Sequence, residues 1–96
     1  LLERNKTMEI IEKENKFLLL NDEREKVGEI DFENNGGKLT ITHTEVQKVL
    51  RKEGLGERLV LSVVEKARET DLSLGATCPY AANYIKHHKR ELEDVL

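Results

Sequence analysis

The hydrophobic pattern of this chain changes its period near residue 54, and that change limits the folds it can adopt. Four short upstream segments are typical of β-strands, and they span residues 9–12, 16–20, 26–32 and 38–46. Downstream, apolar side chains recur at four-residue spacing from Leu55 to Ala67, which predicts an amphipathic helix over residues 54–70. Strands followed by a long helix predict an α+β domain.

The connections between these segments predict how the sheet is built. Asn34-Asn35-Gly36-Gly37 is a strong hairpin signal, so the strands on either side of it should be antiparallel. Residues 73–77 form a short predicted strand after the helix, and a strand-helix-strand unit should be a right-handed parallel crossover. Pro79 can occupy the first turn of a closing helix. We therefore expect one mixed sheet, with antiparallel strands followed by a β-α-β-α tail.

Alternation within residues 38–46 predicts which side chains are buried. Leu39, Ile41 and His43 should lie on one face of this strand, while Thr40, Thr42 and Thr44 should lie on the other. The alternation thus places His43 on a face whose other members are apolar. His43 is therefore expected to be buried.

The length of 96 residues is sufficient for one compact domain and too short for two separate cores. Residues 1–7 are polar and lack a hydrophobic period, whereas Met8 directly precedes the first predicted strand. We expect residues 1–7 to be a tail or a cloning remnant, and residues 8–96 to form a single domain.

Charge and cysteine content disfavour several classes of partner. The formal net charge is -3 and the two signs are interspersed, so neither nucleic acid nor a membrane surface is an expected partner. A single cysteine, Cys78, cannot form an internal disulfide, and the sequence contains no apolar run of membrane-spanning length. These features favour a reducing, cytoplasmic location.

The segment Arg51-Lys52-Glu53-Gly54-Leu55-Gly56 is predicted to be a loop between a strand and the long helix. The N-terminus of a helix presents unpaired N–H groups and the positive end of a dipole, and glycines allow a diphosphate to approach the backbone closely. The alternative is that the two glycines only permit a tight turn from strand to helix.

Three motifs in order resemble those of a known family. Arg-x-x-Gly-x-Gly at Arg51 to Gly56 resembles the acetyl-CoA signature of the GCN5-related N-acetyltransferase (GNAT) superfamily. Together with His43-Thr44-Glu45-Val46 and Cys78-Pro79-Tyr80-Ala81, it resembles the small, stand-alone N-acetyltransferase-like domain family. The resemblance covers nearly the whole chain from Met8.

The resemblance implies a reduced acetyltransferase fold that binds acetyl-CoA or coenzyme A. The strand ending at Val46 would splay from the strand ending at Cys78, and the pantetheine arm would enter the gap. The expected coenzyme-binding positions are Thr44, Glu45, Val46, Arg51, Lys52, Glu53, Gly54, Leu55, Gly56, Glu57 and Arg58.

Two residues are candidates for the chemistry. Cys78 would meet the thioester, where it accepts the acetyl group or assists the departing thiol; the alternative is a small buried apolar side chain. His43 can act as a general base, and the alternative is a hydrogen-bonded core histidine. A hydroxyl of Tyr80 or Tyr84 could protonate the leaving thiolate, although helix packing is the better explanation for both residues. No recognisable metal spacing is present.

Three functions remain open from the sequence. The first is an acyltransferase that passes acetyl from acetyl-CoA to an unidentified amine or similar small nucleophile. The second is a coenzyme A or acyl-CoA binding module with little turnover. The third is a small interaction domain with a purely structural glycine segment. In each case we expect a monomer or a weak dimer.

Overall fold

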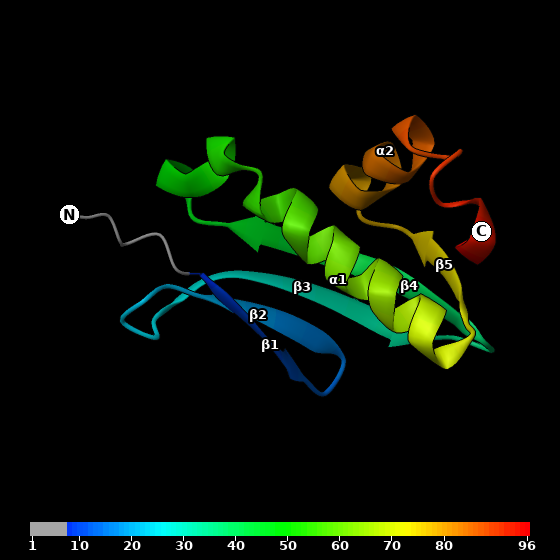
Figure 1. Cartoon of the computed structure of the whole chain (residues 1–96), viewed down its shortest axis with the longest axis horizontal. Helices are drawn as coiled ribbons and strands as arrows, with labels where there is room; N and C mark the ends of the chain where they lie inside the picture. Colours follow the sequence, from blue (N-terminus) through cyan, green and yellow to red (C-terminus); the bar gives the residue numbers. More distant parts are fainter. Residues whose placement is uncertain (1–7) are drawn as a thin grey trace.

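The computed structural model describes residues 8–96, apart from the side chains of residues 51 and 52, and contains one five-stranded mixed sheet (Figure 1). The strands are β1 (Glu9–Lys13), β2 (Lys16–Leu20), β3 (Lys26–Asn34), β4 (Lys38–Val46) and β5 (Ser73–Ala76). They lie in the order β1-β2-β3-β4-β5, and only the β4–β5 pairing is parallel. The predicted α+β fold class is therefore confirmed. The expected tail, residues 1–7, lies outside the described residues.

The helices connect and follow the last strands. The two α-helices are α1 (Leu55–Thr70) and α2 (Pro79–His87), and the two 3-10 helices are η1 (Lys48–Glu53) and η2 (Glu93–Val95). Both α-helices lie on the same side of the sheet, with α1 running across β3 and β4 and α2 next to β5 (Figure 1). Pro79 begins α2, as the sequence predicts.

The predicted hairpin is confirmed between β3 and β4. The Asn35 N–H donates to the Lys38 carbonyl oxygen at 2.8 Å. Gly36 and Gly37 have φ angles of 62° and 90°, which residues with a Cβ rarely adopt. The two glycines thus allow the chain to reverse direction within a short turn.

The core lies between α1 and the sheet. The buried side chains of α1 are Leu55, Leu59, Val60, Val63, Val64 and Ala67. The sheet contributes mainly Phe17, Leu19, Ile30, Phe32, Leu39 and Ile41, all buried. Each fully buried side chain of this size contributes about 1.5–3 kcal/mol relative to leaving it exposed. The helix and the central strands therefore hold each other in place.

A one-residue irregularity in β4 reverses the faces of that strand. Asp31 pairs with His43 and Phe32 pairs with Ile41, so Thr42 is the extra residue of a β-bulge. Beyond the bulge, the side chain of His43 points to the side of the sheet away from the helices and is 54 % exposed. The expectation that His43 is buried is therefore wrong, because the alternation of faces with a period of two residues does not hold across the bulge.

The face of the sheet away from the helices carries a ladder of charged side chains centred on Glu29. Glu29 is only 8 % exposed, and its carboxylate accepts from Lys16 Nζ at 3.0 Å and from Lys26 Nζ at 2.5 Å. The neighbouring Asp31 carboxyl, followed by these two ammonium groups, lowers the pKa of Glu29 to about 2. Burial and then Glu29 raise the pKa of Asp31.

Replacing Glu29 by glutamine should destabilise the protein by about 1–3 kcal/mol at neutral pH, because it removes a buried charge with two partners. A carboxyl whose pKa is lowered on folding contributes stability above its ordinary value of 4.5, and that contribution is lost as the pH falls towards about 2. The variant should lack this part of the acid dependence in urea unfolding. Glu33→Gln, an exposed change on the same strand, is the control, and equal losses in both would contradict the assignment.

Candidate functional site

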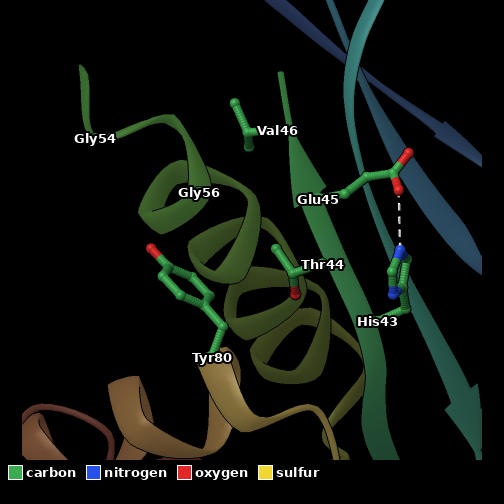
Figure 2. A pocket seen from close by; sticks show the side chains of 7 residues that line it. All are labelled: His43, Thr44, Glu45, Val46, Gly54, Gly56 and Tyr80. Atoms are coloured by element: carbon green, nitrogen blue, oxygen red, sulfur yellow. Dashed lines mark hydrogen bonds and ion pairs between the residues drawn. The ribbon is translucent and has the colours of Figure 1, made fainter. Parts of the chain in front are cut away.

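A cleft of about 520 Å³ opens where β4 continues beyond its parallel partner (Figure 2). Strand β5 pairs with β4 only as far as Ile41, whose carbonyl oxygen accepts from the N–H groups of Thr77 at 2.9 Å and Cys78 at 3.1 Å. The chain then enters α2 and leaves the edge of β4. The residues that line the cleft are His43, Thr44, Glu45, Val46, Gly54, Gly56 and Tyr80.

The main chain of β4 alternates between its partner β3 and the cleft. The Gln47 N–H donates to the Val27 carbonyl oxygen at 2.9 Å, so Glu45 and His43, at two-residue steps, also direct their main-chain groups to β3. Thr44 lies between them and directs its N–H and carbonyl towards the cleft. An extended ligand can therefore pair with this edge in the manner of an added strand.

Gly54 joins the two helices that follow β4. It ends η1 and precedes α1 with a φ of 73°, which favours glycine. The predicted loop over residues 51–56 is therefore wrong: Lys48–Glu53 is a 3-10 helix, and Gly56 is already the second residue of α1. One positive φ angle suffices to change the chain direction, so no longer loop is needed.

The first turn of α1 lies on the opposite wall of the cleft from β4. Gly54 and Gly56 both line it, and the N–H groups that begin an α-helix have no intrahelical partners. Such a helix start favours an anionic group through its N–H donors and its dipole. The side chains of Arg51 and Lys52, which were also predicted to contribute, lie outside what the structure describes.

Tyr80 closes the cleft between α1 and α2. A Cβ atom added to Gly56 would lie 2.8 Å from the Tyr80 hydroxyl oxygen, so this hydroxyl rests against the bare backbone of Gly56. Burial, followed by the charges of Glu57 and Cys78, raises the pKa of Tyr80. Tyr80 therefore keeps its proton at neutral pH and can donate it within the cleft.

His43 and Glu45 form a hydrogen-bonded pair on the outer side of β4, whereas Thr44 and Val46 point towards the helices (Figure 2). The distance from His43 Nε2 to Glu45 Oε1 is 3.0 Å, and both side chains are about half exposed. This hydrogen bond is the main reason that the pKa of His43 is raised. His43 thus lines the cleft at the edge of β4, while its half-exposed ring lies on the outer side of the strand, in contact with solvent.

Cys78 lies behind the cleft rather than in its wall. Its side chain is buried, and Sγ lies 3.5 Å from Oγ1 of Thr44, to which it donates. Thr44 lines the cleft, so the thiol is one contact away from it. His43, Thr44 and Tyr80 line the same cleft, with the His43 ring on the opposite side of β4 from Tyr80, and Cys78 lies next to Thr44.

The family model for the GCN5-related N-acetyltransferases matches residues 16–95. The chain belongs to this family. The resemblance predicted from the three sequence motifs is thereby confirmed.

One similar solved structure is the solution NMR structure of a GCN5-like candidate N-acetyltransferase from Staphylococcus aureus. It is 33 % identical, with a TM-score of 0.75 over 94 % of this chain and 88 % of that one. No curated protein matches the chain.

Two larger acetyltransferases share the fold. A GNAT-family acetyltransferase from Staphylococcus aureus Mu50 is 15 % identical, with a TM-score of 0.62 over 79 % of this chain and 50 % of that one. Nourseothricin acetyltransferase is 24 % identical, with a TM-score of 0.60 over 80 % of this chain and 47 % of that one. The present chain spans about half the length of each.

The remaining predicted positions of this GNAT chain differ in what they can contribute. Leu55 is buried in the core, whereas Glu53 and Arg58 are exposed. The Tyr84 hydroxyl donates to Glu57 Oε2 at 3.3 Å, so this carboxylate at the start of α1 has a partner. The Leu55 side chain therefore anchors the helix in the core, and only the main chain of Leu55 can face a ligand.

Tyr80 lines the cleft, whereas the sequence favoured a helix-packing role for it. Its position two residues after Cys78, at the start of a closing helix, was the available signal. Among the residues that the structure describes, no His, Cys, Asp and Glu side chains form a group that could hold a metal ion. No helix in residues 8–96 is long and apolar enough to cross a membrane.

Proposed function

We propose that this GNAT chain binds acetyl-CoA in the cleft and transfers the acetyl group to an amine. The observation that supports this most strongly is the composition of the cleft: an open strand edge, a helix N-terminus, a histidine and a tyrosine share one cavity. Each of these four parts supplies one requirement of the reaction.

Binding would use mainly the backbone. The pyrophosphate would accept hydrogen bonds from the first N–H groups of α1, close to Gly54 and Gly56. The amides of the pantetheine arm would pair with the main chain of Thr44. The thioester would then lie near Thr44 and Cys78, at the point where β4 and β5 separate.

The transfer needs one base and one acid. His43 accepts a proton from the ammonium group of the acceptor, and the freed nitrogen lone pair forms a C–N bond with the thioester carbon. Main-chain N–H groups at the edge of β4 stabilise the oxyanion of the tetrahedral intermediate. The C–S bond then breaks, and the thiolate of coenzyme A takes the proton of the Tyr80 hydroxyl. The new amide nitrogen loses its second proton to solvent, and the Tyr80 phenolate regains a proton from solvent.

A binding module with little turnover is the second candidate. It is favoured by the face on which His43 lies, which no helix covers in the described part of the chain and which therefore offers little surface to grip an acceptor. In either case the protein would act in the cytoplasm as a monomer or weak dimer, with a coenzyme A thioester as its small-molecule partner.

Calorimetric titration with acetyl-CoA tests the proposal. We expect saturable binding at one site, with a dissociation constant in the range of about 1 μM to 1 mM. Acetyl-pantetheine, which lacks the pyrophosphate, should bind more weakly, because the N-terminus of α1 loses its anion. Absence of saturable binding at millimolar acetyl-CoA would show that the proposal is wrong.

A screen of polyamines, amino acids and peptide amines for release of the coenzyme A thiol then separates the two candidates. Release that depends on one class of amine supports the transferase. Binding without release in the presence of any of these amines supports the binding module.

A further inference from the structure

Glu45 has a side chain that coenzyme binding does not require. The coenzyme would use the main chain at the edge of β4, and the side chain of Glu45 points to the other side of the strand (Figure 2). It shares that side with His43 because residues two apart on a regular strand lie on one face. The bulge at Thr42 thus turns both side chains outward together.

Several charged or titratable groups surround the imidazole. They are the carboxylates of Glu29, Asp31 and Glu45, together with the two lysines next to them, Lys16 and Lys26. Among the described residues, only Glu45 forms a side-chain hydrogen bond with the ring.

The other two carboxylates near the ring, those of Glu29 and Asp31, lie close to lysines. Glu29 is bound by Lys16 and Lys26, and Asp31 Oδ1 lies 3.9 Å from Lys16 Nζ. Glu45 itself divides its two oxygens: Oε1 accepts from His43, while Oε2 lies 4.0 Å from Lys26 Nζ. The arrangement therefore reserves one carboxylate oxygen for His43.

We propose that Glu45 is a positioning residue for His43. The Glu45 carboxylate accepts a hydrogen bond from Nε2–H of His43, which leaves Nδ1 as the proton acceptor for the incoming amine. An ionised carboxylate only accepts hydrogen bonds, so the contact fixes the Nε2–H tautomer of the neutral ring. This inference rests on the proposed acetyl transfer.

The pair acts at the moment when the proton moves. One N–H proton of the acceptor ammonium passes to Nδ1, and the ring becomes an imidazolium with N–H groups at both nitrogens. The negative charge of Glu45 stabilises this cation, which agrees with the raised pKa of His43. The nitrogen lone pair forms the C–N bond, the C–S bond breaks, and the thiolate of coenzyme A leaves with the Tyr80 proton. The amide nitrogen releases its second proton to solvent, from which the Tyr80 phenolate is reprotonated.

The test compares Glu45→Gln with Glu45→Ala. Glutamine keeps an oxygen that can accept from Nε2–H but removes the charge, whereas alanine removes both. In the free protein we expect the pKa of His43, followed by NMR of its ring protons, to fall in both variants. His43→Ala assigns the signal. Glu33→Gln makes the same change of charge on β3, away from the cleft, and should leave the His43 titration unchanged.

In the pH profile of kcat/KM, the acidic limb should move to lower pH in Glu45→Gln, because a weaker base loses its proton earlier. The maximal rate should fall about threefold to fivefold, since the removed interaction is a half-exposed ion pair. Glu45→Ala should lose more, because the tautomer is no longer held.

Failure of this inference and failure of the proposed function give different results. An unchanged His43 pKa and an unchanged acidic limb in Glu45→Gln, within a protein that binds and uses acetyl-CoA, would overturn the role of Glu45. Absence of acetyl-CoA binding by the unaltered protein would instead overturn the proposed function, regardless of the pKa measured for His43.

Discussion

Replacing His43 by alanine is expected to lower kcat for acetyl transfer by about 10²- to 10⁴-fold, which is the usual contribution of a general base. The side chain is 54 % exposed and lies outside the core, so the fold should persist. The dissociation constant for acetyl-CoA should change little, because the proposed coenzyme contacts come from the main chain of β4 and the start of α1. Steady-state rates of thiol release, together with calorimetry, measure both quantities.

His87→Ala is the matched control for this prediction. His87 is exposed at the end of α2, where its Nδ1 lies 2.9 Å from the Asn83 carbonyl oxygen, and it does not line the cleft. A rate for His43→Ala equal to that of the unaltered protein would rule out the role of base.

Cys78→Ala tests whether the acetyl group passes through the Cys78 thiol or is transferred directly to the amine with His43 as the base. If the acetyl group passed through the thiol, intact-mass measurements would detect an acetyl adduct in the His43→Ala protein that disappears when Cys78 is also replaced. The buried thiol, with its donor contact to Thr44, leads us to expect no such adduct.

Replacing Gly56 by valine is expected to weaken acetyl-CoA binding about tenfold to 100-fold. A Cβ atom at this position would approach the Tyr80 hydroxyl to 2.8 Å, so the tyrosine must move and the new side chain must occupy the cleft. Charge-assisted hydrogen bonds from the first N–H groups of α1 would be lost, and each contributes about 1.5–3 kcal/mol. Calorimetric titration measures the loss.

Gly75→Val is the control for Gly56→Val. Gly75 is also partly buried, and an added Cβ would meet Lys38 Cδ at 3.0 Å, again the flexible part of a side chain. Gly75 lies on β5 and does not line the cleft, so its replacement should leave the affinity for acetyl-CoA intact. Unchanged affinity in a folded Gly56→Val protein would contradict the placement of the phosphates at α1.

Local pattern predicted most of the elements. Strands β2 and β4 begin and end at the predicted residues, and the hairpin glycines and Pro79 occupy their predicted turns. These features depend on the preferences of a few neighbouring residues, which a single sequence contains. The three motifs also predicted the family correctly.

What could not be predicted depends on contacts between distant segments. The bulge at Thr42 arises from the pairing of β4 with β3, and no local property of His43 reveals that it faces outward. The contact of Tyr80 with Gly56 joins two helices that are separated by β5. The hydrogen bond between His43 and Glu45 on the outer face could be predicted only if the bulge were already known.

The edge of β4 beyond Ile41 has a consequence for the behaviour of the protein in solution. Strand edges that lack a neighbouring strand can recruit one from another molecule, and this is a common start of aggregation. A coenzyme seated along that edge would block such recruitment and would also stabilise the folded state by mass action. The supply of acetyl-CoA in the cell would then govern the solubility and lifetime of the protein as well as its turnover.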